Sequence, residues 1–181
     1  MAPSATAPAA QSLRVLLTNI TLAGRSGTET VLRNLALSLV KAGHRPIVYS
    51  PHLGPIADEL RAASIPVTAS IETLEETPDV IHGQHVIQTA VALARLPETP
   101  GVFVCHDFIA WHDTPPRLPN LRRYVTISDG FRDRLTVEAG VAPGDVSIIP
   151  NGIDTELFQP GPALPATPRR ALVFAKNRGH V

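Results

Sequence analysis

The stretch LRVLLTNITLAGRSGTETVLRNLALSLVKAG, residues 13–43, decides the fold of this chain. Its apolar run Val15–Leu17 predicts a strand that is covered on both faces of a sheet. Ser26, followed three residues later by Glu29, has the pattern of a capping box, which predicts a helix that begins at about Gly27. A strand that leads through a short loop into a helix is the first unit of an α/β fold.

The second half of the stretch has the periodicity of an amphipathic helix. Its apolar positions are Val31, Leu32, Leu35, Ala36, Leu39 and Val40. They recur every three or four residues and therefore share one helix face. Gly43 is placed to end this helix, because glycine readily adopts the left-handed conformation found at many helix C-termini.

The loop between this strand and this helix is a candidate anion-binding site. It contains Gly24, Ser26 and Gly27 and leads into a helix N-terminus, where free N–H groups and the helix dipole favour negative charge. Many α/β proteins use such a loop for topology alone, and the segment matches neither a GxGxxG nor a Walker pattern. Taken locally, the sequence leaves phosphate binding and a plain turn as equal alternatives.

The composition is that of a globular domain without a preference for polyanions. The chain has 181 residues, enough for one well-buried domain but short for two. Its 16 basic and 16 acidic residues cancel, so nucleic acid is not an expected partner. The one cysteine, Cys105, excludes an intramolecular disulfide and favours a reducing, cytoplasmic location. Its apolar neighbours predict a buried, inert thiol.

Strand and helix patterns alternate along the rest of the chain. Further strands are expected at residues 45–50, 65–68, 78–82, 101–105, 123–127 and 145–149, and helices at 54–63, 86–96 and 129–139. A proline-rich loop is expected at 107–120. This alternation predicts a doubly wound, Rossmann-like α/β fold, a parallel sheet with helices on both faces.

Polar residues follow several predicted strands directly. The carboxyl ends of parallel strands share one edge of the sheet, and ligands bind beyond that edge. We therefore expect one common site, made by Asn19, Gly24, Ser26, Gly27, His82, Gln84, His85, His106, Asp107, Asn151 and Gly152.

The histidines also allow a metal site as an alternative. His82, His85, His106 and His112 fit no common zinc spacing, so a hydrogen-bonded, structural His82 is favoured. His106 at the sheet edge could donate a hydrogen bond, transfer a proton or simply order its loop. Adjacent side chains of a strand point to opposite faces, so no dyad of His106 with Asp107 is expected.

Five segments, in order, resemble the N-terminal domain of family 4 glycosyltransferases, which are retaining enzymes of the GT-B fold. They are SGTE at 26–29, PDVIHGQH at 78–85, VCHD at 104–107, YVTISDGF at 124–131 and VSIIPNGIDTELFQP at 146–160. The resemblance covers about residues 13–160, and its most specific piece is IPNGID at 149–154.

The resemblance implies two Rossmann-like domains, with this chain on the acceptor side and the nucleotide sugar held mostly by the other domain. Gly27 and Glu29 match a G-G-x-E loop near the donor phosphates, in which Ser26 replaces the first glycine. His106 matches a histidine close to the donor sugar and is the candidate catalytic residue. The candidate substrate-binding residues are Gly24, Ser26, Gly27, His85, Asp107, Asn151 and Gly152.

The resemblance also implies the partners. These are a nucleotide-sugar donor and a hydroxyl acceptor, which could be a glycan, a lipid-linked or a small molecule, and no metal or other cofactor is expected. Peripheral membrane contact is left open.

The domain organisation is expected to be a disordered tail at 1–12, the glycosyltransferase domain at 13–158, a linker at 159–169 and the first strand of a second domain at 170–181. The paired glutamates of the family's donor site would lie beyond Val181. The chain alone is therefore expected to be inactive, and a separate C-terminal chain could complement it. The alternatives are a single-domain binding module without catalysis and a nucleotide-sugar epimerase, which the IPNGID segment disfavours.

Overall fold

The computed structural model describes residues 11–107, 109–163, 167, 170 and 171. The chain divides into two compact units, residues 1–151 and residues 152–181. In the second unit, Asp154 closes a turn by accepting hydrogen bonds from the N–H groups of Glu156 and Leu157. Residues 1–10 of the tail expected at 1–12, and nearly all of the strand expected at 170–181, lie outside the described residues.

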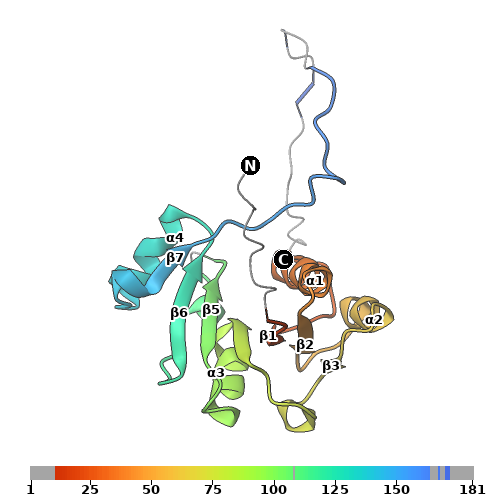
Figure 1. The fold of residues 1–181 in the computed structure, drawn as a ribbon. Coiled ribbons are helices and arrows are strands. Elements are labelled where there is room, and N and C mark those ends of the chain that lie inside the picture. Colours follow the sequence, from red (N-terminus) through yellow and green to blue (C-terminus); the bar gives the residue numbers. More distant parts are fainter. Residues whose placement is uncertain (1–10, 108, 164–166, 168–169, 172–181) are drawn as a thin grey trace, which may run out of the picture. The chain divides into compact units, whose positions relative to one another are not determined.

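A seven-stranded parallel sheet forms the centre of the first unit (Figure 1). Its strands are β1 (Arg14–Thr18), β2 (Arg45–Tyr49), β3 (Val67–Thr68), β4 (Val80–Gln84), β5 (Gly101–Cys105), β6 (Leu121–Thr126) and β7 (Val146–Ile148). Their order in the sheet is β3-β2-β1-β4-β5-β6-β7, and every neighbouring pair is parallel. This arrangement confirms the predicted doubly wound α/β fold.

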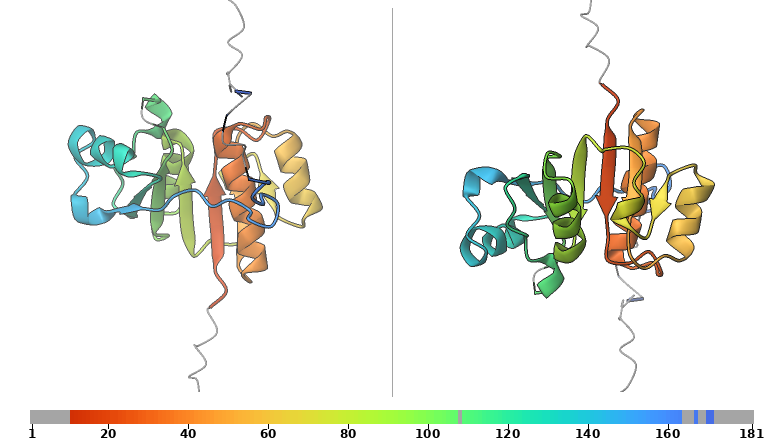
Figure 2. Two further views of the ribbon diagram at one scale, coloured as in Figure 1. Left: turned by 90° about the horizontal axis from the view of Figure 1, so that it is seen from above. Right: turned by 90° about the horizontal axis from the view of Figure 1, so that it is seen from below.

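Helices cover both faces of the sheet, as the buried strands require. The helices are α1 (Gly27–Lys41), α2 (Pro55–Ala62), α3 (Val86–Arg95) and α4 (Asp129–Asp133), with 3-10 turns at Ile71–Thr73, Trp111–Asp113 and Pro143–Asp145. Helices α1 and α3 lie on opposite faces (Figure 2). Alternate residues of β1 enter the two cores, because Leu17 packs with Leu32 of α1 whereas Leu16 packs with Leu93 of α3.

Helix α1 begins and ends where the sequence predicts. Ser26 is its N-cap and forms the capping box. At the other end Gly43 has a φ of 83°, and its N–H donates to the Val40 carbonyl at 3.0 Å. The next N–H, of His44, donates to the Leu39 carbonyl at 2.9 Å. These two bonds form a Schellman ending, which satisfies carbonyls that the helix itself leaves unpaired.

The helix expected over residues 129–139 changes type halfway. Helix α4 ends at Asp133, and Arg134–Glu138 follow as a π-helical turn. Arg134 is buried there, and its guanidinium donates to the carbonyls of Asp107 and Ala110, both at 2.6 Å. We attribute the wider turn to these long-range bonds, which hold Arg134 in place. π-helical turns are rare overall, but those that occur are often found at functional sites.

Strand β4 runs two residues further than expected. The sequence predicts a strand that ends at His82, whereas β4 extends from Val80 to Gln84. His82 consequently lies in the interior of the strand, opposite Leu17 of β1, and not at its end. The polar residues at the carboxyl end of β4 are Gln84 and the following His85.

Gly83 of β4 lies in close contact with Thr89 of α3. A Cβ added there would lie 2.3 Å from Thr89 Cγ2 and 2.4 Å from Thr89 Oγ1. Thr89 has no room to move, because it is buried and its hydroxyl lies 3.3 Å from that of Thr18. A glycine is therefore required for this packing.

We predict that Gly83→Ala lowers the free energy of unfolding by about 1–3 kcal/mol, through overpacking between α3 and β4. Gly27→Ala is the matched control, because a Cβ at Gly27 meets no atom within 4 Å. Urea unfolding of both variants measures the difference. Equal stabilities would contradict the close approach of α3 to β4.

Candidate functional site

The sheet has its topological switch point between β1 and β4. From β1 the chain continues to β2 and β3 on one side, whereas β4 leads to β5, β6 and β7 on the other. In open α/β sheets, ligands bind beyond the carboxyl ends of the strands at such a point. We use the name switch-point rim for the residues there, which are 19–28, 84–88, 106, 107 and 109–113.

Buried polar side-chain atoms without a protein partner concentrate at this rim. Among the described residues they belong to Asn19, His82, Gln84, Gln88, His106 and Asp113. All but His82 belong to the rim, and His82 lies two residues before Gln84 on β4. Protein interiors satisfy nearly all such groups, so their concentration in one place indicates a site for water or a polar ligand.

Glu29 binds the loop that the sequence proposes as an anion site. The residue is 2% exposed, and its carboxylate accepts hydrogen bonds from the N–H groups of Gly24 and Ser26, both at 2.7 Å. Two of the loop's donors are therefore used by the chain's own carboxylate. Gly27, the first residue of α1, is exposed, and a ligand anion at this loop would meet its N–H.

The charge of Glu29 is favoured in the folded chain. Burial by itself raises the pKa of this carboxyl, but hydrogen bonds from Ser26 and Gly24 outweigh burial and hold the pKa below the ordinary glutamate value. The carboxylate also lies in the first turn of α1, where the helix dipole stabilises negative charge.

His85 ties two loops of the rim together. Its backbone has a φ of 66°, a left-handed conformation that is uncommon for residues other than glycine and is often found at functional sites. Its Nδ1 accepts a hydrogen bond from the N–H of Ile20 at 3.1 Å. Burial, aided by the nearby His112 and His106, lowers the pKa of His85 to about 4, so the ring is neutral at pH 7. The proton of this neutral ring is then on Nε2.

Three side chains of the rim are close enough to be considered as metal ligands. His85, His112 and Asp113 place ligand atoms within 4.8 Å of one another, and the two imidazole rings are 4.9 Å apart. A metal-bound histidine offers a lone pair on one nitrogen and donates an N–H from the other. In His85 the lone pair of Nδ1 already accepts the N–H of Ile20, and Nε2 carries the proton. Neither nitrogen of the neutral ring therefore offers a free lone pair to a metal. The expectation that no metal is required stays a prediction.

His106 and Asp107 engage different partners. The backbone N–H of His106 donates to Asp113 at 2.7 Å, whereas Asp107 accepts from the N–H groups of Ile109 and Ala110 at 2.7 and 2.8 Å. Burial is the main cause that lowers the pKa of His106 to about 4. A neutral His106 with an unpartnered, buried Nε2 can form a hydrogen bond to a hydroxyl group, but its ring is not protonated to the cation at pH 7.

The structure brings most of the predicted site residues to one rim. The loop containing Gly24, Ser26 and Gly27 is joined to His85 through Ile20, and His85 lies near His106. Asn151 and Gly152 are different, because they are the last residue of the first unit and the first residue of the second. The part that each plays in binding stays a prediction.

Asp113 is a rim residue that the sequence does not single out. It is 1% exposed, and one of its oxygens is bound by the N–H of His106 while the other has no partner. Burial raises the pKa of its carboxyl. Asp113 stands in an irregular, proline-rich segment, where no periodic pattern distinguishes a buried aspartate from an exposed one.

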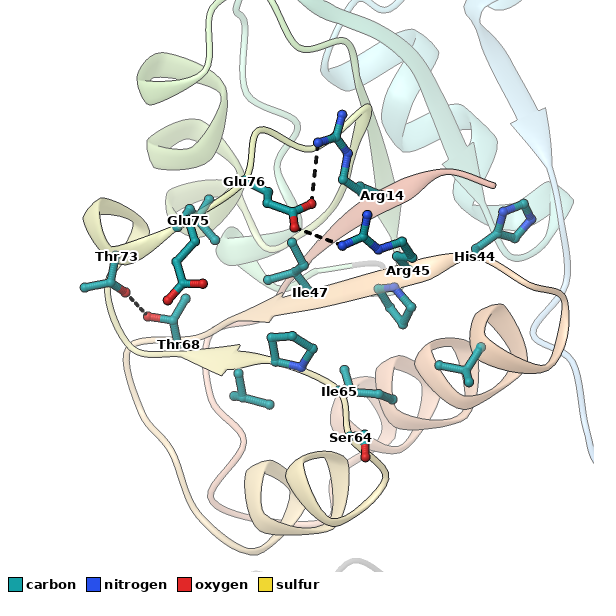
Figure 3. Close-up of a pocket in the computed structure, with 15 residues that line it drawn as sticks. Arg14, His44, Arg45, Ile47, Ser64, Ile65, Thr68, Thr73, Glu75 and Glu76 are labelled. Atoms are coloured by element: carbon teal, nitrogen blue, oxygen red, sulfur yellow. Dashed lines mark hydrogen bonds and ion pairs between the residues drawn. The ribbon is translucent and has the colours of Figure 1, made fainter. Parts of the chain in front are cut away.

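A cavity of about 700 Å³ lies at the opposite edge of the sheet, by the amino ends of β1, β2 and β3 (Figure 3). Its two arginines, Arg14 and Arg45, both pair with Glu76, at 3.5 and 2.9 Å. The two arginine charges in this cavity are thus matched within the chain, and none of the unpartnered buried atoms belongs to its lining. The chemistry of the described residues therefore favours the switch-point rim as the site.

No helix within the described part of the chain combines the length and the hydropathy needed to cross a membrane.

Comparison with known proteins gives a family match and a set of similar folds. The sequence model of Glycosyltransferase Family 4 matches residues 25–157. A comparison with curated proteins gives no match.

Similar solved structures include a glycosyltransferase from Rickettsia africae ESF-5, with 13% identity and a TM-score of 0.59, over 80% of this chain and 44% of that one. Anabaena Alr3699/HepE in complex with UDP-glucose has 17% identity and a TM-score of 0.61, over 83% of this chain and 47% of that one. The same protein in complex with UDP and glucose has 16% identity and a TM-score of 0.60, with the same coverage. This chain thus spans less than half the length of these structures, and the likeness establishes the fold.

We predict that Glu29→Gln lowers the free energy of unfolding at neutral pH by about 1–2 kcal/mol, because glutamine retains one acceptor but loses the charge. The lowered pKa of Glu29 means that its contribution is complete above the ordinary glutamate pKa of about 4.3 and is lost as the pH falls through the folded value. The difference between the two proteins should therefore shrink in acid.

Urea unfolding at a series of pH values measures this difference. Glu75→Gln, at an exposed position, is the control and should have little effect. A difference that persists unchanged in acid would contradict the role assigned to the Glu29 charge.

Proposed function

The chain belongs to glycosyltransferase family 4, and from this we propose that it is the acceptor-side domain of a retaining, nucleotide-sugar-dependent glycosyltransferase. In such a reaction a hydroxyl oxygen of the acceptor replaces the diphosphate at the anomeric carbon, and the configuration is kept. The acceptor is a glycan, a lipid-linked or a small molecule. The single cysteine, Cys105, leaves no intramolecular disulfide to form, which is consistent with the cytoplasmic location that we propose.

The observation that carries this proposal is the concentration of unpartnered polar groups at the switch-point rim. The carboxamides of Asn19 and Gln84 have both donors and acceptors, and neither group has a protein partner. The imidazole of His106 adds a neutral group with an unpartnered nitrogen. A ligand rich in hydroxyl groups, each of which is donor and acceptor, fits this set better than a purely anionic ligand does.

We assign the donor phosphates to the N-terminus of α1. The N–H of Gly27 is exposed there, whereas Glu29 holds the neighbouring loop in shape through Gly24 and Ser26. Backbone N–H groups that are fixed before the reaction stabilise a leaving diphosphate without a metal. Since Glu29 already contributes a negative charge at this place, the domain supplies only part of the diphosphate site.

We assign the sugar to His85 and His106. Both rings are neutral at pH 7, because burial lowers their pKa values to about 4. Each can therefore form hydrogen bonds to sugar hydroxyls without changing charge near neutrality. Asp107 orders the loop that follows His106, and Asn151 with Gly152 forms the connection towards the second unit.

Anabaena Alr3699/HepE was solved with UDP-glucose, and we propose a nucleoside diphosphate sugar as the donor here as well. In the GT-B architecture the donor lies in a cleft between two domains, and the matched 80–83% of this chain corresponds to 44–47% of the similar structures. We therefore propose that residues 1–181 alone bind sugar ligands weakly and transfer none.

We predict that Gly27→Ala weakens the binding of UDP-glucose to the chain about tenfold, which corresponds to ~1.4 kcal/mol. The added Cβ would lie beside the N–H that we assign to the phosphates, but it meets no atom of the chain within 4 Å. Folding should therefore be unaffected. Ligand-observed NMR measures the binding, and Gly144→Ala, which also meets no atom within 4 Å, is the matched control. Equal loss of binding in both variants would oppose the assignment.

We predict that purified residues 1–181 release no UDP from UDP-glucose in the presence of simple glycosides as acceptors. The reason is that the described residues supply one wall of a cleft. A coupled assay for released UDP measures this. Robust release would contradict the proposal that the domain is inactive alone, and failure to bind any nucleotide sugar would contradict the proposed function itself.

A further inference from the structure

Trp111 is an exposed aromatic side chain held at the switch-point rim. It is the one tryptophan of the chain, and it is 62% exposed in the 3-10 turn Trp111–Asp113. Its ring contacts that of His112 edge to face, with centroids 5.8 Å apart. His112 in turn contacts the ring of His85 at 4.9 Å. This chain of rings connects Trp111 to the histidine that we assign to the sugar.

The backbone around Trp111 is fixed by several independent bonds. Asp107 accepts from the N–H groups of Ile109 and Ala110, and the buried Arg134 donates to the carbonyls of Asp107 and Ala110. The carbonyl of Trp111 itself accepts from Thr114 at 3.1 Å. An exposed tryptophan on a backbone that is held this firmly loses little conformational entropy when a ligand covers it.

The surroundings of Trp111 favour a sugar ring over a membrane surface. The segment 105–117 contains two aspartates and a single basic residue, the exposed Arg117. Peripheral membrane sites usually add basic residues to their exposed aromatic ones, because bilayers carry anionic lipids. The C–H groups on one face of a pyranose ring are weakly positive and match the negative face of an indole. The hydroxyls around the ring would then point towards His112 and the polar rim.

We propose that Trp111 is a stacking platform for a pyranose ring of the acceptor. This inference rests on the proposed function. It narrows the acceptor to a molecule with a sugar ring next to the hydroxyl that is glycosylated, and it places that ring beside His112, on the outer side of His85.

The fluorescence of the chain tests this proposal directly, because Trp111 is its one tryptophan and can be excited at a wavelength that the two tyrosines do not absorb. The probes are methyl glycopyranosides of glucose, mannose and galactose. The controls are glycerol, a polyol without a ring, and vesicles of phosphatidylcholine with phosphatidylglycerol. We expect a saturable change in emission with at least one glycoside and none with glycerol. No change with any glycoside, or a change with vesicles only, would overturn the proposal.

Variants distinguish stacking on Trp111 from nonspecific binding to exposed apolar side chains. Measured by ligand-observed NMR, Trp111→Ala should weaken glycoside binding about three- to tenfold, whereas Trp111→Phe should retain most of it. Ile109→Ala is the matched control, since Ile109 is 86% exposed in the same loop and would be shared by a membrane site but not by a stacked ring. Unchanged binding in Trp111→Ala, or an equal loss in Ile109→Ala, would overturn the proposal.

The proposed function can fail separately from this inference. Glycoside binding at Trp111 without nucleotide-sugar binding would support the stacking platform and contradict the proposed transferase function. Nucleotide-sugar binding without any effect of glycosides at Trp111 would support the proposed transferase function and contradict the stacking platform.

Discussion

Parallel pairing of β1 with β4 is the constraint on which the rest of the site depends. It places the end of β1 beside the end of β4, although about 65 residues of sequence separate them. The N–H of Ile20 can then reach the ring of His85 at 3.1 Å. That one bond fixes which nitrogen of His85 carries the proton, and it thereby favours hydrogen bonding to a ligand over coordination of a metal.

Most charged side chains at the switch-point rim have hydrogen-bond partners within the chain. Glu29 occupies two N–H groups of the first loop, Arg134 donates to two carbonyls, and the buried His85 and the half-buried His106 are neutral. What is left for a ligand is a set of neutral donors and acceptors, the unpartnered carboxyl oxygen of Asp113 and one open helix N-terminus at Gly27. Such a surface suits hydroxyl groups, and it leaves most of a diphosphate's charge to be balanced elsewhere.

The sequence predicts the sheet, its parallel strands and both ends of α1, because these follow from local periodicity and capping residues. It also predicts the family, from five weak segments in a fixed order. It does not predict the π-helical turn at Arg134 or the burial of Asp113. Both depend on bonds to residues 107–110 or to His106, which become neighbours only when the chain is folded.

The central claim is that sugar ligands bind at the switch-point rim. Amide chemical-shift mapping of the chain, titrated with a nucleoside diphosphate and then with a methyl glycoside, tests it most directly. The account predicts shifts at Gly27 for the first ligand and at His85, His106 and Trp111 for the second. Shifts centred on Arg14 and Arg45, in the cavity at the opposite edge of the sheet, would contradict it.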